Sequence, residues 1–117
     1  MKKNGLLALC VVALVLVITS TVAGQVSSAA LLGEISDQAS AALPGAKVTA
    51  RHEATGFSRS AVTNAEGSYR IGDLLPGRYT VTAEKEGFHT VTINAVVLEV
   101  NQKARLDLQL KVGLQQE

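Results

Sequence analysis

The sequence predicts an all-β fold, a seven-strand antiparallel Greek-key β-sandwich preceded by an N-terminal signal-peptide helix. Three observations predict it. Apolar and polar residues alternate in about seven stretches, which is the pattern of strands with one buried face. Turn-forming residues, Pro-Gly pairs among them, separate these stretches at intervals typical of strands. No helical periodicity follows the first 24 residues. Sheets with one dry face are stable when two of them stack, so the strands are expected to form a sandwich.

Residues 1–24 have the three parts of a secretory signal peptide. Lys2 and Lys3 give a positive start, residues 6–18 are all apolar, and small residues follow up to Gly24. This apolar run is shorter than the roughly 20 residues that span a bilayer. Cleavage is expected after Ala23 or Gly24, and the alternatives are a later cut after Ala30 or an uncleaved N-terminal anchor.

The cysteine and charge content narrow the class of protein. Cys10, the single cysteine, lies inside the apolar run rather than after it, so lipidation is not expected and the exported chain can form no disulfide. Without Lys2 and Lys3, nine basic residues face ten acidic ones, a net charge of −1. This balance, with two Tyr, two Phe and no Trp, is unlike that of nucleic-acid-binding proteins.

After the signal peptide, the sequence indicates a flexible polar lead at 25–30, one domain at 31–112 and a tail at 113–117. The expected strands of the domain are 31–36, 46–51, 58–63, 68–71, 78–84, 89–100 and 105–112.

Alternation also assigns each strand an inward face. The strand at 89–100 changes phase near Asn94 and Ala95, which predicts a β-bulge there. The inward residues expected in the clearest strands are Ala46, Val48, Ala50, Tyr79, Val81, Ala83, Val91, Ile93, Val96, Leu98, Val100, Leu106, Leu108, Leu110 and Val112.

Two Pro-Gly pairs, at 44–45 and 76–77, each lead directly into an alternating strand. Proline sets the φ of the first central residue of a type II turn, and glycine accepts the positive φ of the second. We therefore expect a type II turn at both places. Residues 64–67 are expected to close a hairpin, and Glu86-Gly87 to form another reversal.

The order of these motifs resembles the carboxypeptidase regulatory-like domain, a seven-strand β-sandwich of the transthyretin-like (prealbumin-like) kind. The resemblance covers about residues 30–111, and its motif residues are structural in that family. The motifs are GEISD at 33–37, LPGAKV at 43–48, TG at 55–56, TNAEGSY at 63–69, LLPGRYTV at 74–81 and EGF at 86–88.

A signal peptide, this domain and the Leu-x-Leu-x-Leu-x-Val-Gly ending at 106–113 together resemble the N-terminal extension of certain TonB-dependent outer-membrane receptors. The resemblance implies secretion across the inner membrane of a Gram-negative bacterium, to the periplasm or outer membrane. It implies a cell-envelope protein (an outer-membrane receptor or barrel) or a glycan as partner. Membrane contact is expected only through the signal segment, if that stays uncleaved. Because plug and barrel are absent, the chain is expected to be a stand-alone relative or a truncated receptor.

A search for catalytic groups yields no candidate, and no catalytic, cofactor-binding or metal-binding residue is assigned. His52 and His89 are expected to be solvent-facing residues at strand ends, and no Gly-x-Ser-x-Gly motif is present. Two separated histidines are too few for a zinc site. The transthyretin-like hydrolase of 5-hydroxyisourate ends in Tyr-Arg-Gly-Ser, whereas this chain ends in Leu-Gln-Gln-Glu. The expected class is therefore not an enzyme, and no cofactor is expected.

Binding sites are the other possibility. Asn64, Glu66 and Asp73, with Asp37, carry oxygen ligands but lack calcium-loop spacing, so solvated turns are favoured. Tyr69, Tyr79 and Phe88 are expected in the core or its turns, which leaves Phe57 as the one ring for stacking on a sugar. The polar sheet face is expected to include Thr49, Arg51, Thr80, Thr82 and Glu84.

The function expected from the sequence is a non-enzymatic, secreted accessory or binding module. The alternative is an independent carbohydrate- or protein-binding module of the cell envelope.

Overall fold

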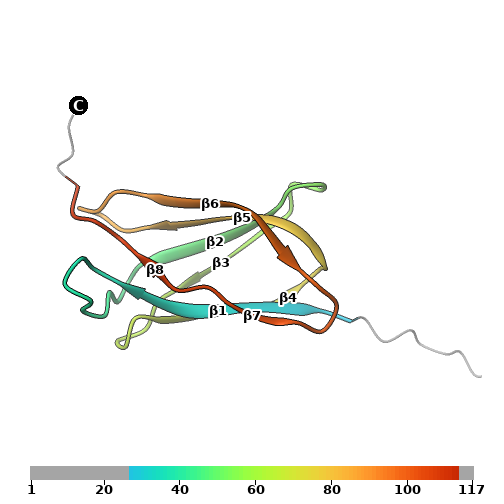
Figure 1. Ribbon diagram of the computed structural model, residues 1–117, viewed down its shortest axis with the longest axis horizontal. Coiled ribbons are helices and arrows are strands. Elements are labelled where there is room, and N and C mark those ends of the chain that lie inside the picture. Colours follow the sequence, from blue (N-terminus) through green and yellow to red (C-terminus); the bar gives the residue numbers. More distant parts are fainter. Residues whose placement is uncertain (1–26, 114–117) are drawn as a thin grey trace, which may run out of the picture.

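The computed structural model describes residues 27–113, which form two stacked sheets (Figure 1). One sheet has the order β4-β1-β7, with β8 also paired to β1, and the other has the order β3-β2-β5-β6. The predicted signal peptide lies outside the described residues. The strands are β1 (Ala29–Ser36), β2 (Lys47–His52), β3 (Ser58–Val62), β4 (Ser68–Leu74), β5 (Gly77–Glu84), β6 (Val91–Leu98), β7 (Lys103–Arg105) and β8 (Leu108–Gln109).

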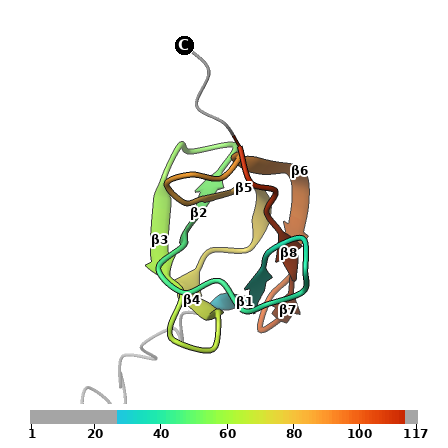
Figure 2. The same ribbon diagram turned by 90° about the vertical axis from the view of Figure 1, so that its left-hand side faces the viewer.

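The all-β sandwich predicted from the sequence is confirmed, and Figure 2 shows its two sheets as separate layers. Strands β2 and β5 are neighbours although β3 and β4 lie between them in the chain. A strand that returns beside the first of three earlier strands is the Greek-key arrangement. Within residues 27–113 no helix is long and apolar enough to cross a membrane.

The expected strand at 105–112 is instead two short strands, β7 and β8, and both pair with β1 in parallel. The expectation of a purely antiparallel sandwich is therefore wrong for this sheet. Alternation reports which face a residue takes, whereas strand direction depends on how the chain crosses between sheets. Here the chain leaves β6 in one sheet and enters the other beside β1, running in the same direction.

Residues 106 and 107 form an arch between β7 and β8. A Cβ on Gly33 of β1 would collide with the carbonyl oxygen of Leu106. The backbone N–H of Leu106 still donates to Leu32 O at 2.8 Å. On the same edge of β1, the next N–H is that of Glu34, and it donates to the carboxylate of Asp107 at 2.8 Å. A side chain thus replaces one backbone partner in the ladder, and this is why the strand is interrupted.

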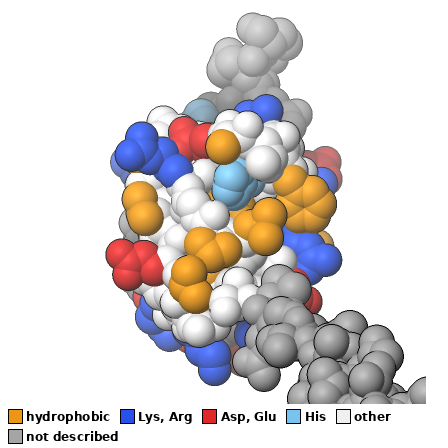
Figure 3. Space-filling model, turned by 90° about the vertical axis from the view of Figure 1, so that its right-hand side faces the viewer, with side chains coloured by type: hydrophobic (Ala, Val, Ile, Leu, Met, Phe, Trp, Pro, Cys, Tyr) orange, Lys and Arg blue, Asp and Glu red, His pale blue; other side chains and the backbone are white. Residues whose placement is uncertain are grey.

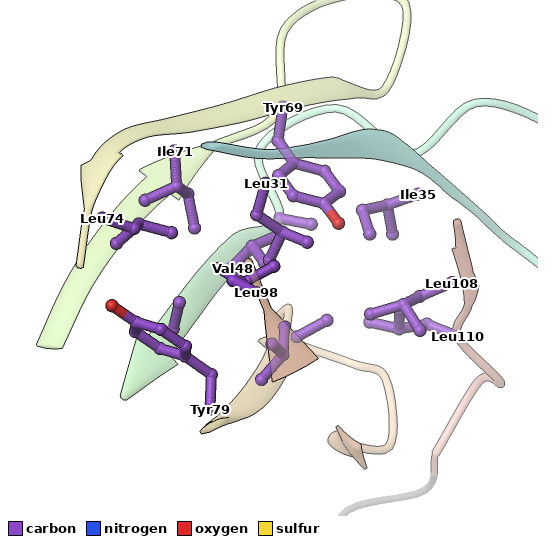
Figure 4. Close-up of a cluster of buried hydrophobic side chains, with 14 of the residues drawn as sticks. Leu31, Ile35, Val48, Tyr69, Ile71, Leu74, Tyr79, Leu98, Leu108 and Leu110 are labelled. Carbon is purple, nitrogen blue, oxygen red and sulfur yellow. The ribbon is translucent and has the colours of Figure 1, made fainter. Parts of the chain in front are cut away.

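The core lies between the sheets (Figure 4) and contains most of the residues that alternation placed inward. Leu108 and Leu110 are buried as expected, but Leu106 is only partly buried, and Val100 and Val112 are exposed. The last two lie outside the strands, where the period of two no longer applies. The core residues are Ala29, Leu31, Ile35, Leu43, Ala46, Val48, Ala50, Tyr69, Ile71, Leu74, Tyr79, Val81, Ala83, Leu98, Leu108 and Leu110.

Strand β1 begins at Ala29, whereas the sequence indicated a flexible lead over residues 25–30. Ala29 and Ala30 are buried, and Ala30 N donates to Gln102 O at 2.9 Å.

The bulge expected near Asn94 and Ala95 is confirmed. Tyr79 pairs with Val96 and Val81 pairs with Ile93, so β6 has one more residue than β5 between these pairs. Ala95 takes a φ of 58°, in the left-handed region where the extra residue of some bulges lies. The extra residue turns both halves of β6 toward the core.

The two Pro-Gly connections differ. Gly45 has the φ of 74° that a type II turn requires, and the buried Thr63 hydroxyl donates to Leu43 O and accepts from Ala46 N across this turn. Gly77 has a φ of 145°, so the type II turn expected there is wrong. Strands β4 and β5 lie in different sheets, and Pro76-Gly77 therefore forms a crossover instead of a hairpin.

Candidate functional site

The most distinctive surface is one end of the sandwich, where β2, β4 and β6 finish and β3 and β5 begin. We call it the His52 end, and it consists of the connections 53–57, 75–76 and 99–102 with the adjoining strand ends.

His52 is buried at 8% exposure, so the expectation of a solvent-facing histidine is wrong. Strand β2 includes His52, and period two places its side chain on the inward face with Val48 and Ala50. Its ring meets the Tyr79 ring edge to face, with centroids 5.0 Å apart. The strand predicted from the sequence ends one residue early, at Arg51, so the inward position of His52 was not predicted.

The His52 ring joins two connections. Thr55 N donates to Nδ1 at 3.3 Å, and the Thr55 hydroxyl lies 3.1 Å from the same atom. Since Nδ1 accepts, the ring proton is on Nε2, which donates to Pro76 O at 3.3 Å. Beside it, the Tyr79 hydroxyl donates to Leu75 O at 2.7 Å, and burial raises the pKa of Tyr79. The histidine therefore fixes loops, and its nitrogens are both occupied.

His89 is exposed, as expected, and lies at the opposite end of the sandwich, just before β6. Its backbone N–H donates to Lys111 O at 2.8 Å. The two histidines are thus not brought together, and they form no common site.

The residues considered for calcium serve turns instead. Asn64 Oδ1 accepts from Glu66 N and Ser68 N, while Asp37 Oδ1 accepts from Ala39 N and Ala41 N. Asp73 lies 3.7 Å from Arg59. Among the residues that the structure describes, no group of three or more His, Cys, Asp or Glu side chains could hold a metal ion.

Shifted pKa values mark the arch at 106–107. The Tyr69 hydroxyl donates to Leu106 O at 2.5 Å, and burial, with the nearby charge of Asp107, raises the pKa of Tyr69 to about 12. The N–H of Glu34 lowers the pKa of Asp107, and the Arg105 guanidinium adds to this at 3.1 Å. These groups hold β7 and β8 against β1, so the fold accounts for them.

The outer face of the β3-β2-β5-β6 sheet carries a row of hydroxyls. The register aligns Ser60, Thr49, Thr82 and Thr92 across the four strands, and the hydroxyls of Thr49 and Ser60 are 2.9 Å apart. Thr49 and Thr82 belong to the polar face that the sequence predicts, and the register brings them side by side.

The His52 end carries four of the six large hydrophobic side chains that are exposed in residues 27–113. Figure 3 views this end and shows hydrophobic side chains gathered around a histidine. The four residues are Phe57, Leu75, Val97 and Val100. Phe57 was expected to be outside the core. The exposure of the other three was not predicted, because it depends on where loops leave the sheets.

Solved structures of low sequence identity share the fold. A candidate carbohydrate-binding protein from Bacteroides uniformis aligns with a TM-score of 0.58 and 19% identity, over 70% of this chain and 40% of that one. Catechol 1,2-dioxygenase from Acinetobacter aligns with a TM-score of 0.59 and 15% identity, over 81% of this chain and 56% of that one. At these identities the likeness concerns the β-sandwich alone.

Sequence comparison gives a closer relationship. The chain is 40% identical over 52 residues to the TonB-dependent transporter Oar of Myxococcus xanthus, a match that covers 44% of this chain and 5% of the transporter. The chain therefore spans only a small part of that relative. The model of the carboxypeptidase regulatory-like domain matches residues 30–111, which is the range of the resemblance noted in the sequence. On this match the chain belongs to the carboxypeptidase regulatory-like domain family.

Proposed function

We propose that the chain is an exported, non-enzymatic accessory domain of the Gram-negative cell envelope that works with a TonB-dependent transporter. The observation that carries the proposal is the 40% identity to the Myxococcus xanthus transporter within a regulatory-like domain. The chain enters the described domain at the His52 end and leaves it at the opposite end (Figure 1). This layout suits a domain that is placed in line between other segments.

Export through the signal peptide is part of the proposal. Cleavage after Ala23 or Gly24 would leave β1 whole, whereas cleavage after Ala30 would remove Ala29 and Ala30, which are buried. We therefore favour the earlier cut. Expression of the full chain in a Gram-negative host, followed by fractionation and N-terminal sequencing, should give a periplasmic protein that begins at Gly24 or Gln25. Intact chain in the cytosol would rule export out.

The link to a transporter is tested by the neighbouring DNA and by pull-down from envelope extracts. We expect a reading frame for a plug and barrel near this gene, and a TonB-dependent transporter among the proteins captured with the tagged chain. If both are absent, the accessory role is wrong.

The absence of catalysis is tested directly. A transthyretin-like hydrolase would turn over 5-hydroxyisourate, and substituting His52 or His89 would abolish this. We expect no turnover by the unaltered chain.

A second candidate, a glycan-binding module, is favoured by the hydroxyl row of Ser60, Thr49, Thr82 and Thr92. Hydroxyls in a line across neighbouring strands can bond to the hydroxyls of a polysaccharide. A glycan array probed with the chain should then show binding that Thr49→Val and Thr82→Val together remove. An array without signal would eliminate this candidate.

A further inference from the structure

The exposed apolar side chains of the His52 end come from four segments of the chain. Phe57 is in the β2–β3 loop, Leu75 in the β4–β5 crossover, Val97 near the end of β6 and Val100 in the β6–β7 loop. Their exposed fractions are between 49% and 58%. Apolar side chains gathered on one surface of a soluble domain mark a place of contact with another apolar phase.

The crossover that presents Leu75 is held firmly. Its carbonyl accepts from the buried Tyr79 hydroxyl, and the next carbonyl, that of Pro76, accepts from His52. On either side, Asp73 has a φ of 54° and Gly77 a φ of 145°. Positive φ is uncommon at a residue other than glycine, so the backbone on either side of Leu75 has a restricted geometry. The fold therefore fixes Leu75 in its outward position.

The chain outside the structure shows what lies next to this end. Ala29, the first residue of β1, pairs with Leu74 at the end of β4, so residues 1–26 are attached at the His52 end. This segment contains the apolar run 6–18 behind Lys2 and Lys3. Only residues 19–26 separate the run from the described domain, and fully extended they reach about 26–29 Å. Before the proposed cleavage, while the run lies in the bilayer, this short connection keeps the His52 end within that distance of the membrane.

Arginines border the apolar side chains. A guanidinium nitrogen of Arg51 lies 3.4 Å from the position of a Cβ on Gly56, next to Phe57 in the chain, and Arg78 pairs across strands with Val97. Two arginines also have acidic neighbours. Arg78 lies 3.9 Å from Glu53, and Arg59 lies 3.7 Å from Asp73. Cations beside apolar side chains suit a membrane surface, where the charge meets phosphate and the apolar part meets acyl chains. Separate protruding side chains suit a fluid phase, which needs no groove of matched shape.

We propose that the His52 end docks on a phospholipid surface, with Phe57, Leu75, Val97 and Val100 entering the edge of the bilayer and Arg51 and Arg78 contacting lipid phosphates. This goes beyond the accessory function, because it gives the folded domain a membrane contact in addition to that of the signal segment.

The chain contains no Trp, so single-Trp variants report position cleanly. We would place Phe57→Trp and, as a matched control, Val62→Trp in the chain that begins at Gln25, which is the product expected from cleavage after Gly24. Val62 is exposed and pairs with Lys47, at the opposite end of the sandwich. Both proteins are mixed with phosphatidylethanolamine–phosphatidylglycerol vesicles, with and without brominated acyl chains. Because neither protein contains the apolar run, a difference between them reports which end of the folded domain touches lipid by itself.

With Phe57→Trp, the emission should move to shorter wavelength and lose intensity to the brominated lipid, and with Val62→Trp it should do neither. Equal responses in the two proteins would overturn the proposal.

A second set of variants tests the neighbouring residues. Leu75→Asp and Val97→Asp, added to Phe57→Trp, should abolish the wavelength shift while the thermal unfolding midpoint stays near that of the parent, because both side chains are exposed. An undiminished shift in a folded protein would show that Leu75 and Val97 do not enter the bilayer, and would overturn the proposal in this form.

Discussion

His52, Thr63, Tyr69 and Tyr79 show one principle at the scale of single residues, since each brings a polar group into or beside the core and bonds it to a loop. Thr63 fixes the turn at 44–45, Tyr69 the arch at 106–107, and the other two the crossover at 75–76. In residues 27–113 no buried side-chain N or O atom is left without a partner. A buried polar group without a partner is costly, so these residues select one loop geometry.

Leu108→Asp should lower the free energy of unfolding by about 3 kcal/mol or more, because it places an unpaired charge in the core. Leu108 is 8% exposed, whereas Val112, on the same expected face, is 63% exposed. Val112→Asp is the matched control and should change stability little. Urea denaturation of both variants measures this, and equal losses would contradict the assignment of inward residues.

Tyr69 predicts a loss of stability in alkaline solution. Its pKa in the folded chain is about 12, above the ordinary value of 10.0. The neutral hydroxyl is favoured in the folded state, so its contribution is complete below pH 10 and is lost as the pH rises from 10 to 12. Tyr69→Phe should reduce this pH dependence, and at pH 7 it should cost about 1–2 kcal/mol because Leu106 O loses its donor. Urea denaturation at pH 7 and at several values up to 11 provides the comparison, and an unchanged slope would argue against the buried hydroxyl.

At the scale of elements, the free sheet edges are protected in different ways. Strand β6 carries the bulge at Ala95. On β3, Arg59 extends toward the other sheet and bonds to Gly72 O at 3.2 Å. Bulges and inward-pointing charges are means by which natural sheets avoid pairing with other molecules. The strands are therefore suited to remain within one domain, and contact is left to the ends and the outer faces.

Gly33 tests the arch between β7 and β8. Gly33→Ala should destabilise the domain by about 1–3 kcal/mol, because the added methyl group meets the Leu106 backbone, which cannot move without breaking its bond to Leu32. Gly72→Ala is the control, since its methyl group would meet only the flexible Arg70 side chain. Thermal unfolding should separate the two variants, and similar midpoints would mean that the arch is not tightly packed.

For the molecule as a whole, one core shared by both sheets predicts cooperative unfolding. The chain without residues 1–24 should show a β-rich circular dichroism spectrum and a single transition that is the same by fluorescence and circular dichroism. A helical spectrum, or two separate transitions, would contradict the sandwich.

Much of the fold could be predicted from the sequence, but little of the candidate site could. Strands 46–51, 58–63 and 78–84 were predicted within one residue at each end, and the bulge at Ala95 was located. The burial of His52 was missed because one more residue in β2 reverses the face. Leu75, Val97 and Val100 were missed as a group because they come from distant parts of the chain.

The sequence by itself determined that the chain forms a β-sandwich and which face of most strands is dry, because alternation is a local property that each strand carries in its own residues. Only the tertiary structure decided that β7 and β8 run parallel to β1, that His52 joins two connections, and that four apolar side chains meet at one end. These features depend on how the chain crosses between sheets, and such crossings bring together residues that no local pattern relates.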